Sequence, residues 1–129
     1  MKKVLLVDDE EDFVSALAER LRIRKYDVKV ATNGETALRE ISKERPDIVL
    51  LDLKMPGLSG MDTLRRIVTQ DPTIDVIMMT GALDSEAGPL ALEAGAVEHI
   101  VKPLDLNDLE EKFKEIGKKD AASIEHASG

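Results

Sequence analysis

Cysteine and tryptophan are absent from this chain of 129 residues, and it has no long apolar run. The lack of cysteine excludes disulfide frameworks, thiolate zinc sites and cysteine nucleophiles, although it says little about the cellular compartment. No stretch approaches the roughly 18–20 apolar residues that span a bilayer. The short apolar run at residues 4–7 is not a signal peptide, because acidic residues begin at Asp8. We therefore expect a cytoplasmic protein without a membrane partner.

Positive charge is also scarce. The chain has 18 Lys and Arg residues against 26 Asp and Glu residues, which gives a formal net charge of −8. This balance opposes binding to nucleic acid, since that affinity comes mainly from Lys and Arg displacing counterions. The hydrophobic fraction of 43% and the charged fraction of 34% are typical of a folded soluble chain. We expect a single domain that does not bind nucleic acid directly.

Short apolar runs alternate with segments of helical periodicity along the chain. Phe13, Leu17 and Leu21 show such a helical spacing. Alternation of this kind predicts parallel strands joined by right-handed crossovers, in a doubly wound α/β sandwich with functional groups at the carboxyl ends of the strands. The predicted strands, of which the second is the weakest, cover residues 4–7, 28–31, 48–51, 76–79 and 97–101.

The end of the chain differs from the rest. After Gly117, residues 118–129 lose apolar periodicity and are rich in Ala, Ser and charged residues. We expect the folded domain to cover residues 1–117 and residues 118–129 to form a flexible tail or a truncated linker.

Polar residues stand at the predicted strand ends: Asp8 and Asp9, Asp52, Thr80 and Lys102. Parallel strands bring such residues to one edge of the sheet. Clustered carboxylates repel one another unless they are protonated or bridged by a cation, and their hard oxygen ligands suit Mg²⁺. The alternative for the acidic pair is a negative first helical turn, favoured by capping and by the helix dipole.

Asp52 follows four apolar residues, so it is either a cap for the next segment or a reactive group. A carboxylate can attack phosphorus to give an acyl phosphate if nearby positive charge neutralises the transferring group. Lys102 can supply a compact charge, and the Thr80 hydroxyl can donate to a phosphoryl oxygen. Their alternatives are a solvated strand end and a turn cap. The Lys102–Pro103 bond is a candidate for a cis peptide, since only X-Pro bonds adopt cis at modest cost.

Four motifs follow one another along the chain: KVLLVDDE at 3–10, IVLLDLKMPGLSGMD at 48–62, VIMMTGA at 76–82 and HIVKPLD at 99–105. In this order and separation they resemble the receiver domain of bacterial response regulators, from Lys3 to about Ile116. The resemblance implies a flavodoxin-like (βα)5 fold with a five-stranded parallel sheet in the order 2-1-3-4-5. It also implies a phosphoacceptor switch whose chemistry is directed at itself, and not an enzyme with a separate substrate.

The resemblance also implies roles for single residues. Asp52 would be the phosphoacceptor, and Asp9 and Asp52 would bind Mg²⁺ together with the backbone carbonyl of Lys54. Asp8 would act on the metal through water, while Thr80 and Lys102 would bind the phosphoryl group.

The implied partners are proteins. The implied donor is a histidine kinase or a histidine phosphotransfer protein. The implied output is a downstream protein effector that reads a two-state change on the face of helix 4, strand 5 and helix 5. The same face is also a candidate for homodimerisation.

Two features depart from the family pattern. His99 stands where the family usually has Tyr or Phe as a switch residue that moves with Thr80, and a histidine there is smaller and titratable. Gly88 and Pro89 fall in the region expected for helix 4, so that helix is expected to begin at Pro89 or to be kinked.

Three other classes compete with this interpretation. An aspartyl-phosphate hydrolase usually has a second aspartate two residues after the first, where this chain has Lys54. A flavodoxin-like mononucleotide binder needs a hydroxyl-rich loop and several aromatic residues, but the loop here is acidic and the only aromatic residues are Phe13, Tyr26 and Phe113. A receiver-like interaction domain without phosphorylation is the main alternative, and the full set of polar strand-end residues argues against it.

Overall fold

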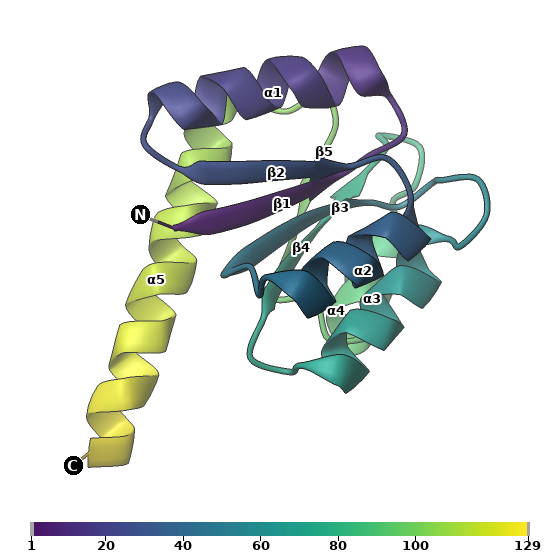
Figure 1. The fold of residues 1–129 in the computed structure, drawn as a ribbon. Helices are drawn as coiled ribbons and strands as arrows, with labels where there is room; N and C mark the ends of the chain where they lie inside the picture. The colour runs from purple at the N-terminus through teal and green to yellow at the C-terminus, as the bar shows by residue number, and fades with distance from the viewer. Residues whose placement is uncertain (1, 129) are drawn as a thin grey trace.

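The computed structural model describes the backbone of residues 2–128 and the side chains of residues 2–117. Strands and helices alternate along the whole described chain (Figure 1). Each predicted strand is confirmed to within one residue at either end. The elements are β1 Lys3–Val7, α1 Glu11–Ile23, β2 Asp27–Ala31, α2 Gly34–Lys43, β3 Ile48–Asp52, α3 Gly60–Gln70, β4 Asp75–Thr80, α4 Ala87–Glu93, β5 Glu98–Val101 and α5 Leu106–Ser128.

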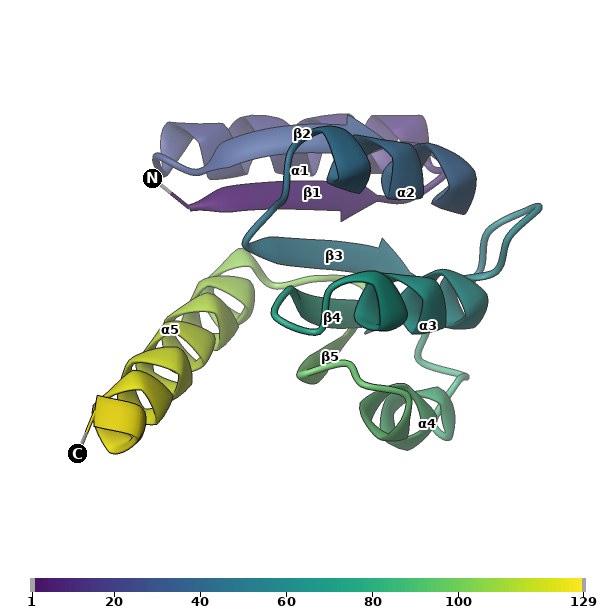
Figure 2. The same ribbon diagram turned by 60° about the horizontal axis from the view of Figure 1, so that its bottom comes forward.

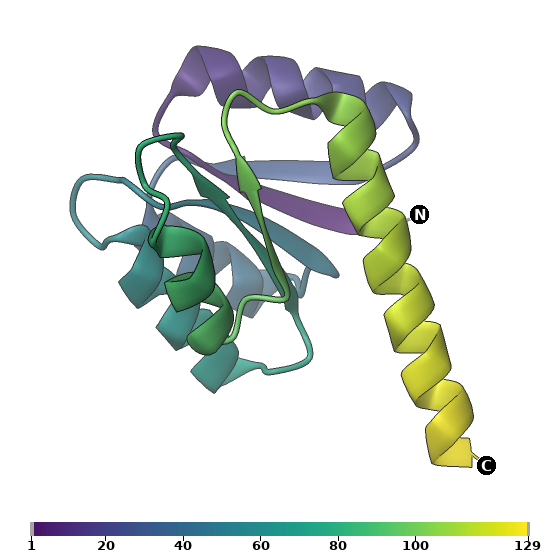
Figure 3. The same ribbon diagram turned by 180° about the vertical axis from the view of Figure 1, so that it is seen from behind.

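The five strands form one parallel sheet in the order β2-β1-β3-β4-β5, which confirms the predicted fold class. Helices α2, α3 and α4 cover one face of the sheet, and α1 and α5 cover the other (Figures 2 and 3). Because every crossover returns the chain to the same end of the sheet, all carboxyl ends of the strands share one edge. That edge carries the candidate site.

Strand β3 lies at the centre of the sheet and separates two apolar cores. Ile48 and Leu50 pack in the core under α1 and α5, whereas Val49 and Leu51 pack in the core under the other three helices. All five residues of the strand are buried. Burial on both faces explains why the sequence here is a continuous apolar run that ends in one carboxylate, Asp52.

The start of α3 approaches the end of β3 very closely. A side chain at Gly60 would collide with the backbone carbonyl groups of Asp52 and Leu53. The helix is capped by Ser59, whose hydroxyl accepts the Asp62 N–H at 3.1 Å. Glycine and cap together bring α3 back onto the sheet directly after the candidate acceptor.

Helix α4 is only seven residues long and begins at Ala87, so the expectation of a start at Pro89 was wrong. Pro89 is the third residue of this helix. The first-turn positions have no intrahelical acceptor for their N–H groups, so a proline there costs no hydrogen bond.

Helix α5 continues through Ser128 and extends away from the sheet (Figures 1 and 3). The domain boundary at residue 117 and the flexibility expected beyond it stay predictions, and Gly129 lies outside the described residues. No helix among the described residues combines the length and the apolar character needed to cross a membrane.

Candidate functional site

The carboxyl ends of β1 and β3 bring three carboxylates together. One oxygen from each of Asp8, Asp9 and Asp52 lies within 4.8 Å of the others. Asp8 is fully buried and Asp52 is 7% exposed, whereas Asp9 is exposed. The structure therefore places all three predicted acidic residues in one cluster that solvent reaches from one side.

The capping alternative for the acidic pair accounts for only part of its geometry. Asp8 Oδ1 accepts the Glu10 N–H at 2.9 Å, as a turn-forming aspartate does. However, Glu10 is the residue that caps α1, and its side chain makes no capping hydrogen bond. The second oxygen of Asp8 is directed to another group, the ammonium of Lys102.

Lys102 follows β5 and reaches across the sheet edge into the acidic cluster. Its Nζ lies 2.7 Å from Asp8 Oδ2, 3.3 Å from Asp52 Oδ1 and 3.4 Å from Glu10 Oε1. The same nitrogen lies 4.7 Å from the centre of the Phe13 ring. The peptide bond between Lys102 and Pro103 is cis. Sequence reasoning missed the contacts with Glu10 and Phe13, because it assigned Phe13 to the apolar face of a helix.

The charges at this site do not balance. Burial raises the pKa of Asp52 to about 6, and the neighbouring charge of Asp8 adds to this increase, while Lys102 opposes it. Burial alone would lower the pKa of Lys102, but the hydrogen bond to Asp8 and the charge of Asp52 raise it overall. The ammonium of Lys102 is thus one positive charge beside a cluster of three carboxylates. Such a cluster fits a hard divalent cation with oxygen ligands.

An open cavity of about 320 Å³ lies beside Asp52 and gives a ligand access to it. Lys54 and Asp84 face each other on its rim, with 3.1 Å between Lys54 Nζ and Asp84 Oδ1. The role predicted for the backbone carbonyl of Lys54 stays a prediction. Thr80 ends β4 and is 2% exposed, next to Gly81 in the wall of the cavity.

His99 lies on β5, in register with Met78 of β4, and does not join the acidic cluster. Its ring packs against α4 at Gly88, where an added Cβ atom would lie 2.6 Å from His99 Nε2. Its Nδ1 atom is buried without a hydrogen-bond partner in the described part of the chain, and the Glu98 carboxylate is 3.8 Å away. The imidazole therefore lies against α4, although the His99 side chain is still 35% exposed.

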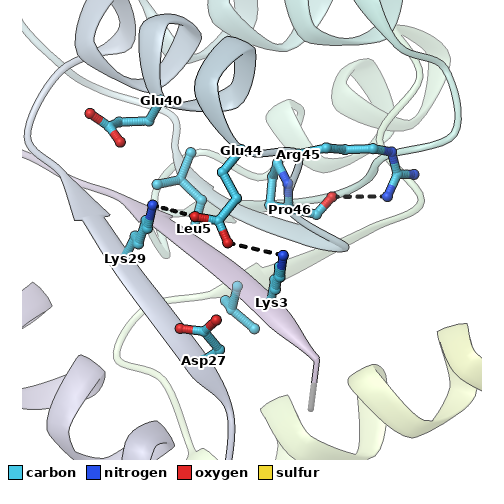
Figure 4. Close-up of a pocket in the computed structure, with 9 residues that line it drawn as sticks. Lys3, Leu5, Asp27, Lys29, Glu40, Glu44, Arg45 and Pro46 are labelled. Atoms are coloured by element: carbon cyan, nitrogen blue, oxygen red, sulfur yellow. Dashed lines mark hydrogen bonds and ion pairs between the residues drawn. The ribbon is translucent and has the colours of Figure 1, made fainter.

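The opposite edge of the sheet carries a second cluster of charged residues (Figure 4). Glu44 lies between two ammonium groups, with 2.9 Å to Lys3 and 2.5 Å to Lys29. The hydrogen bonds from Lys29 and Lys3 lower the pKa of Glu44 to about 2. The cavity beside these residues measures only about 20 Å³, so it offers little room for a ligand.

Comparison with known proteins agrees with the fold. A family model described as the response regulator receiver domain matches residues 4–114. Sporulation initiation phosphotransferase F from Bacillus subtilis (strain 168) is 37% identical over 113 residues, which make up 88% of this chain and 91% of that protein. A response regulator receiver domain protein from Clostridium thermocellum has a TM-score of 0.88 at 34% identity, covering 95% of this chain and 99% of the other.

Other relatives are longer than this chain. The alkaline phosphatase synthesis transcriptional regulatory protein PhoP from Bacillus subtilis (strain 168) is 34% identical over 89% of this chain, but the match covers only 48% of that protein. Since the family model matches most of the chain and the sporulation protein is matched over nearly its whole length, the chain belongs to the response regulator receiver domain family, the signalling switches of two-component systems.

Proposed function

We propose that Asp52 accepts a phosphoryl group in a Mg²⁺-dependent reaction and that this modification switches the face formed by α4, β5 and α5. The observation that carries the proposal is the position of the Asp52 carboxylate. It lies within 4.8 Å of the Asp8 and Asp9 oxygens and 3.3 Å from Lys102 Nζ. In the proposal, Asp52 is the nucleophile, the acidic cluster binds the metal and Lys102 binds a phosphoryl oxygen.

The chemistry follows from charge. Asp52 must be ionised to attack phosphorus, and its raised pKa opposes ionisation in the metal-free protein. Mg²⁺ held by Asp9 and Asp52, with Asp8 acting through water and the Lys54 carbonyl completing the set, would supply the positive charge that favours the carboxylate. Lys102 neutralises the transferring group, which is what phosphoryl transfer requires of a protein. Thr80, the last residue of β4, would donate its hydroxyl to a phosphoryl oxygen.

The signal would travel from Thr80 to the surface through His99. Receiver domains are two-state switches, and a ligand shifts such an equilibrium by binding one state better. The His99 ring lies in the space left by the absent side chain at Gly88 of α4, so a change at Thr80 that displaces the ring would also displace the helix. The role of His99 can be tested with His99→Ala, which should weaken phosphorylation-dependent partner binding and leave phosphorylation itself intact.

The proposed donor is a histidine kinase or a histidine phosphotransfer protein, and the proposed output is contact with a protein effector. One relative is named a phosphotransferase and others are transcriptional regulators. We propose a cytoplasmic location on the basis of this signalling role, with the α4–β5–α5 face also serving any homodimer.

The central experiment measures intact mass after incubation with Mg²⁺ and acetyl phosphate. We expect a phosphoryl-sized increase for wild type and none for Asp52→Asn or after EDTA. Asp71→Asn is the matched control, because Asp71 is a partly exposed carboxylate that pairs with Arg45 in another part of the surface. An increase that persists in Asp52→Asn would place the acceptor elsewhere. No increase with acetyl phosphate or with histidine kinases would favour an interaction domain without phosphorylation.

A further inference from the structure

An aromatic ring lies beside the lysine of the site. Phe13 is the third residue of α1 and one of only three aromatic residues in the chain. Its ring centre is 4.7 Å from Lys102 Nζ, within the range over which a ring face attracts a cation. The ring also packs against the core under α1 and α5, which limits its movement.

The ring lies beside an ammonium that has competing partners. Asp8 and Asp52 hold Lys102 inward, whereas the Glu10 carboxylate, whose side chain is 66% exposed, offers a partner nearer to solvent. Lysine is a flexible side chain with a compact charge, so its position depends on what surrounds it. The side chain of Lys102 is only 19% exposed in this arrangement.

Phosphoryl transfer demands that the ammonium move. In the structure Lys102 is bonded to Asp8 and Asp52, but in the proposed reaction it must turn to an oxygen of the incoming group. Hydrogen bonds to Asp8 are directional and would be lost in that movement. Attraction to a ring face varies less with the exact position of the cation, so the same ring can hold the ammonium before and after.

We infer that Phe13 is a positioning residue for Lys102, and that its ring keeps the ammonium directed into the site during phosphorylation of Asp52. The inference rests on the proposed function, since it assigns a role within that reaction. It implies that loss of the ring slows phosphorylation and leaves Mg²⁺ affinity unchanged, because Phe13 does not touch the acidic cluster itself.

The test compares Phe13→Leu, which keeps an apolar side chain, with Phe13→Tyr, which keeps a ring. With acetyl phosphate and saturating Mg²⁺, we expect Phe13→Leu to phosphorylate about fivefold more slowly and Phe13→Tyr to stay near wild type. The matched control is Phe113→Leu. Phe113 contacts Tyr26 at a centroid distance of 5.2 Å in the core, so its loss should lower the melting temperature without slowing phosphorylation of the folded protein.

Two further measurements separate positioning from a structural effect. In a Lys102→Met background, Phe13→Leu should cause no additional slowing, because the interaction that it removes is already absent. The side-chain methylene protons of Lys102 should show a ring-current shift by NMR in wild type and Phe13→Tyr, but not in Phe13→Leu. This signal needs no phosphorylation.

The outcomes distinguish the two proposals. Phosphorylation of Phe13→Leu at the wild-type rate would overturn the inference, as would a Phe13→Tyr variant as slow as Phe13→Leu. Slowing that persists in Lys102→Met would also overturn it, because the ring would then act through another group. If wild type shows the ring-current shift but is never phosphorylated on Asp52, the proposed function fails while the contact itself stands.

Discussion

The two edges of the sheet both gather carboxylates and lysines, yet they treat the carboxylates in opposite ways. At the amino edge, which is the side of the sheet where the strands begin, Lys29 and Lys3 lower the pKa of Glu44 to about 2 (Figure 4). At the carboxyl edge, burial and Asp8 raise the pKa of Asp52 to about 6, although Lys102 lies close to it.

The difference teaches that the ratio of charges and their burial decide what such a cluster does. Glu44 has two ammonium partners and a partly exposed side chain, so its charge is already neutralised without another cation. The carboxyl edge has one ammonium for three clustered carboxylates, and two of these, Asp8 and Asp52, are buried. Negative charge exceeds positive charge there, and a cavity of about 320 Å³ gives a cation access to the cluster. The same residue types therefore make an ion-pair cluster at one edge and a candidate metal and phosphoryl site at the other.

The largest difference in stability is expected when one lysine is removed from each edge. Lys102→Met leaves the fully buried Asp8 without its cation, and we expect a loss of about 3 kcal/mol in the free energy of unfolding in EDTA. Lys3→Met should change stability little, because its partner Glu44 is partly exposed and keeps Lys29. Urea unfolding of the two variants measures the difference.

Added Mg²⁺ should restore part of the stability lost in Lys102→Met and none of any loss in Lys3→Met. This follows because a metal ion at the carboxyl edge would replace the missing positive charge. Equal losses for the two variants would mean that burial does not separate the two edges. A failure of Mg²⁺ to stabilise Lys102→Met would count against the metal site.

The next largest effect is expected for Asp52→Asn without metal. A raised carboxylate pKa means that the folded protein binds a proton more readily than the unfolded chain does, so ionisation costs stability. The cost is absent below the unfolded-state pKa near 3.8 and complete above the folded-state value of about 6. At pH 7 in EDTA, Asp52→Asn should therefore be more stable than wild type by at most about 3 kcal/mol.

The pH dependence of that gain is the decisive measurement. The advantage of Asp52→Asn should shrink between pH 7 and pH 4, because wild-type Asp52 gains its proton over this range. The pH dependence of Glu44→Gln should have the opposite sign. A lowered pKa means that ionised Glu44 adds stability above its unfolded-state pKa of 4.5, and this stability is lost as the pH falls toward the folded-state value of about 2. A constant difference between wild type and Asp52→Asn across the range would contradict the raised pKa.

Much of the fold and of the site followed from the sequence because strand ends are easily recognised. Four of the five runs of apolar residues end at a polar residue of the candidate site, as at Asp52 and Thr80, and a parallel sheet places such ends at one edge. Side-chain neighbours across elements did not follow in this way. Helical periodicity grouped Phe13 with Leu17, but it carried no information on which strand end the ring would face.

His99 and Gly88 also show that the sequence does not predict side-chain neighbours across elements. The sequence marked them as two separate departures from the family, one a changed switch residue and the other a weakened helix. In the structure they are one feature, because the missing side chain at Gly88 makes room for the imidazole. Complementary pairs of this kind depend on how a helix lies against a strand, so a single sequence does not reveal them.

The smallest effect that we expect is the loss of stability in Glu44→Gln, and this loss should depend on salt. Glu44→Gln at neutral pH should reduce stability less than either change at the carboxyl edge, because its partners are exposed lysines. Charges in solvent are screened within about 3 Å at 1 M salt, so this loss should disappear at high ionic strength. The gain from Asp52→Asn should persist in 1 M KCl, since it arises mainly from the burial of Asp52, which salt does not screen. Unfolding curves of both variants at low and high KCl test this, and a gain for Asp52→Asn that vanished with salt would show that screened charges, and not burial, raise the pKa of Asp52.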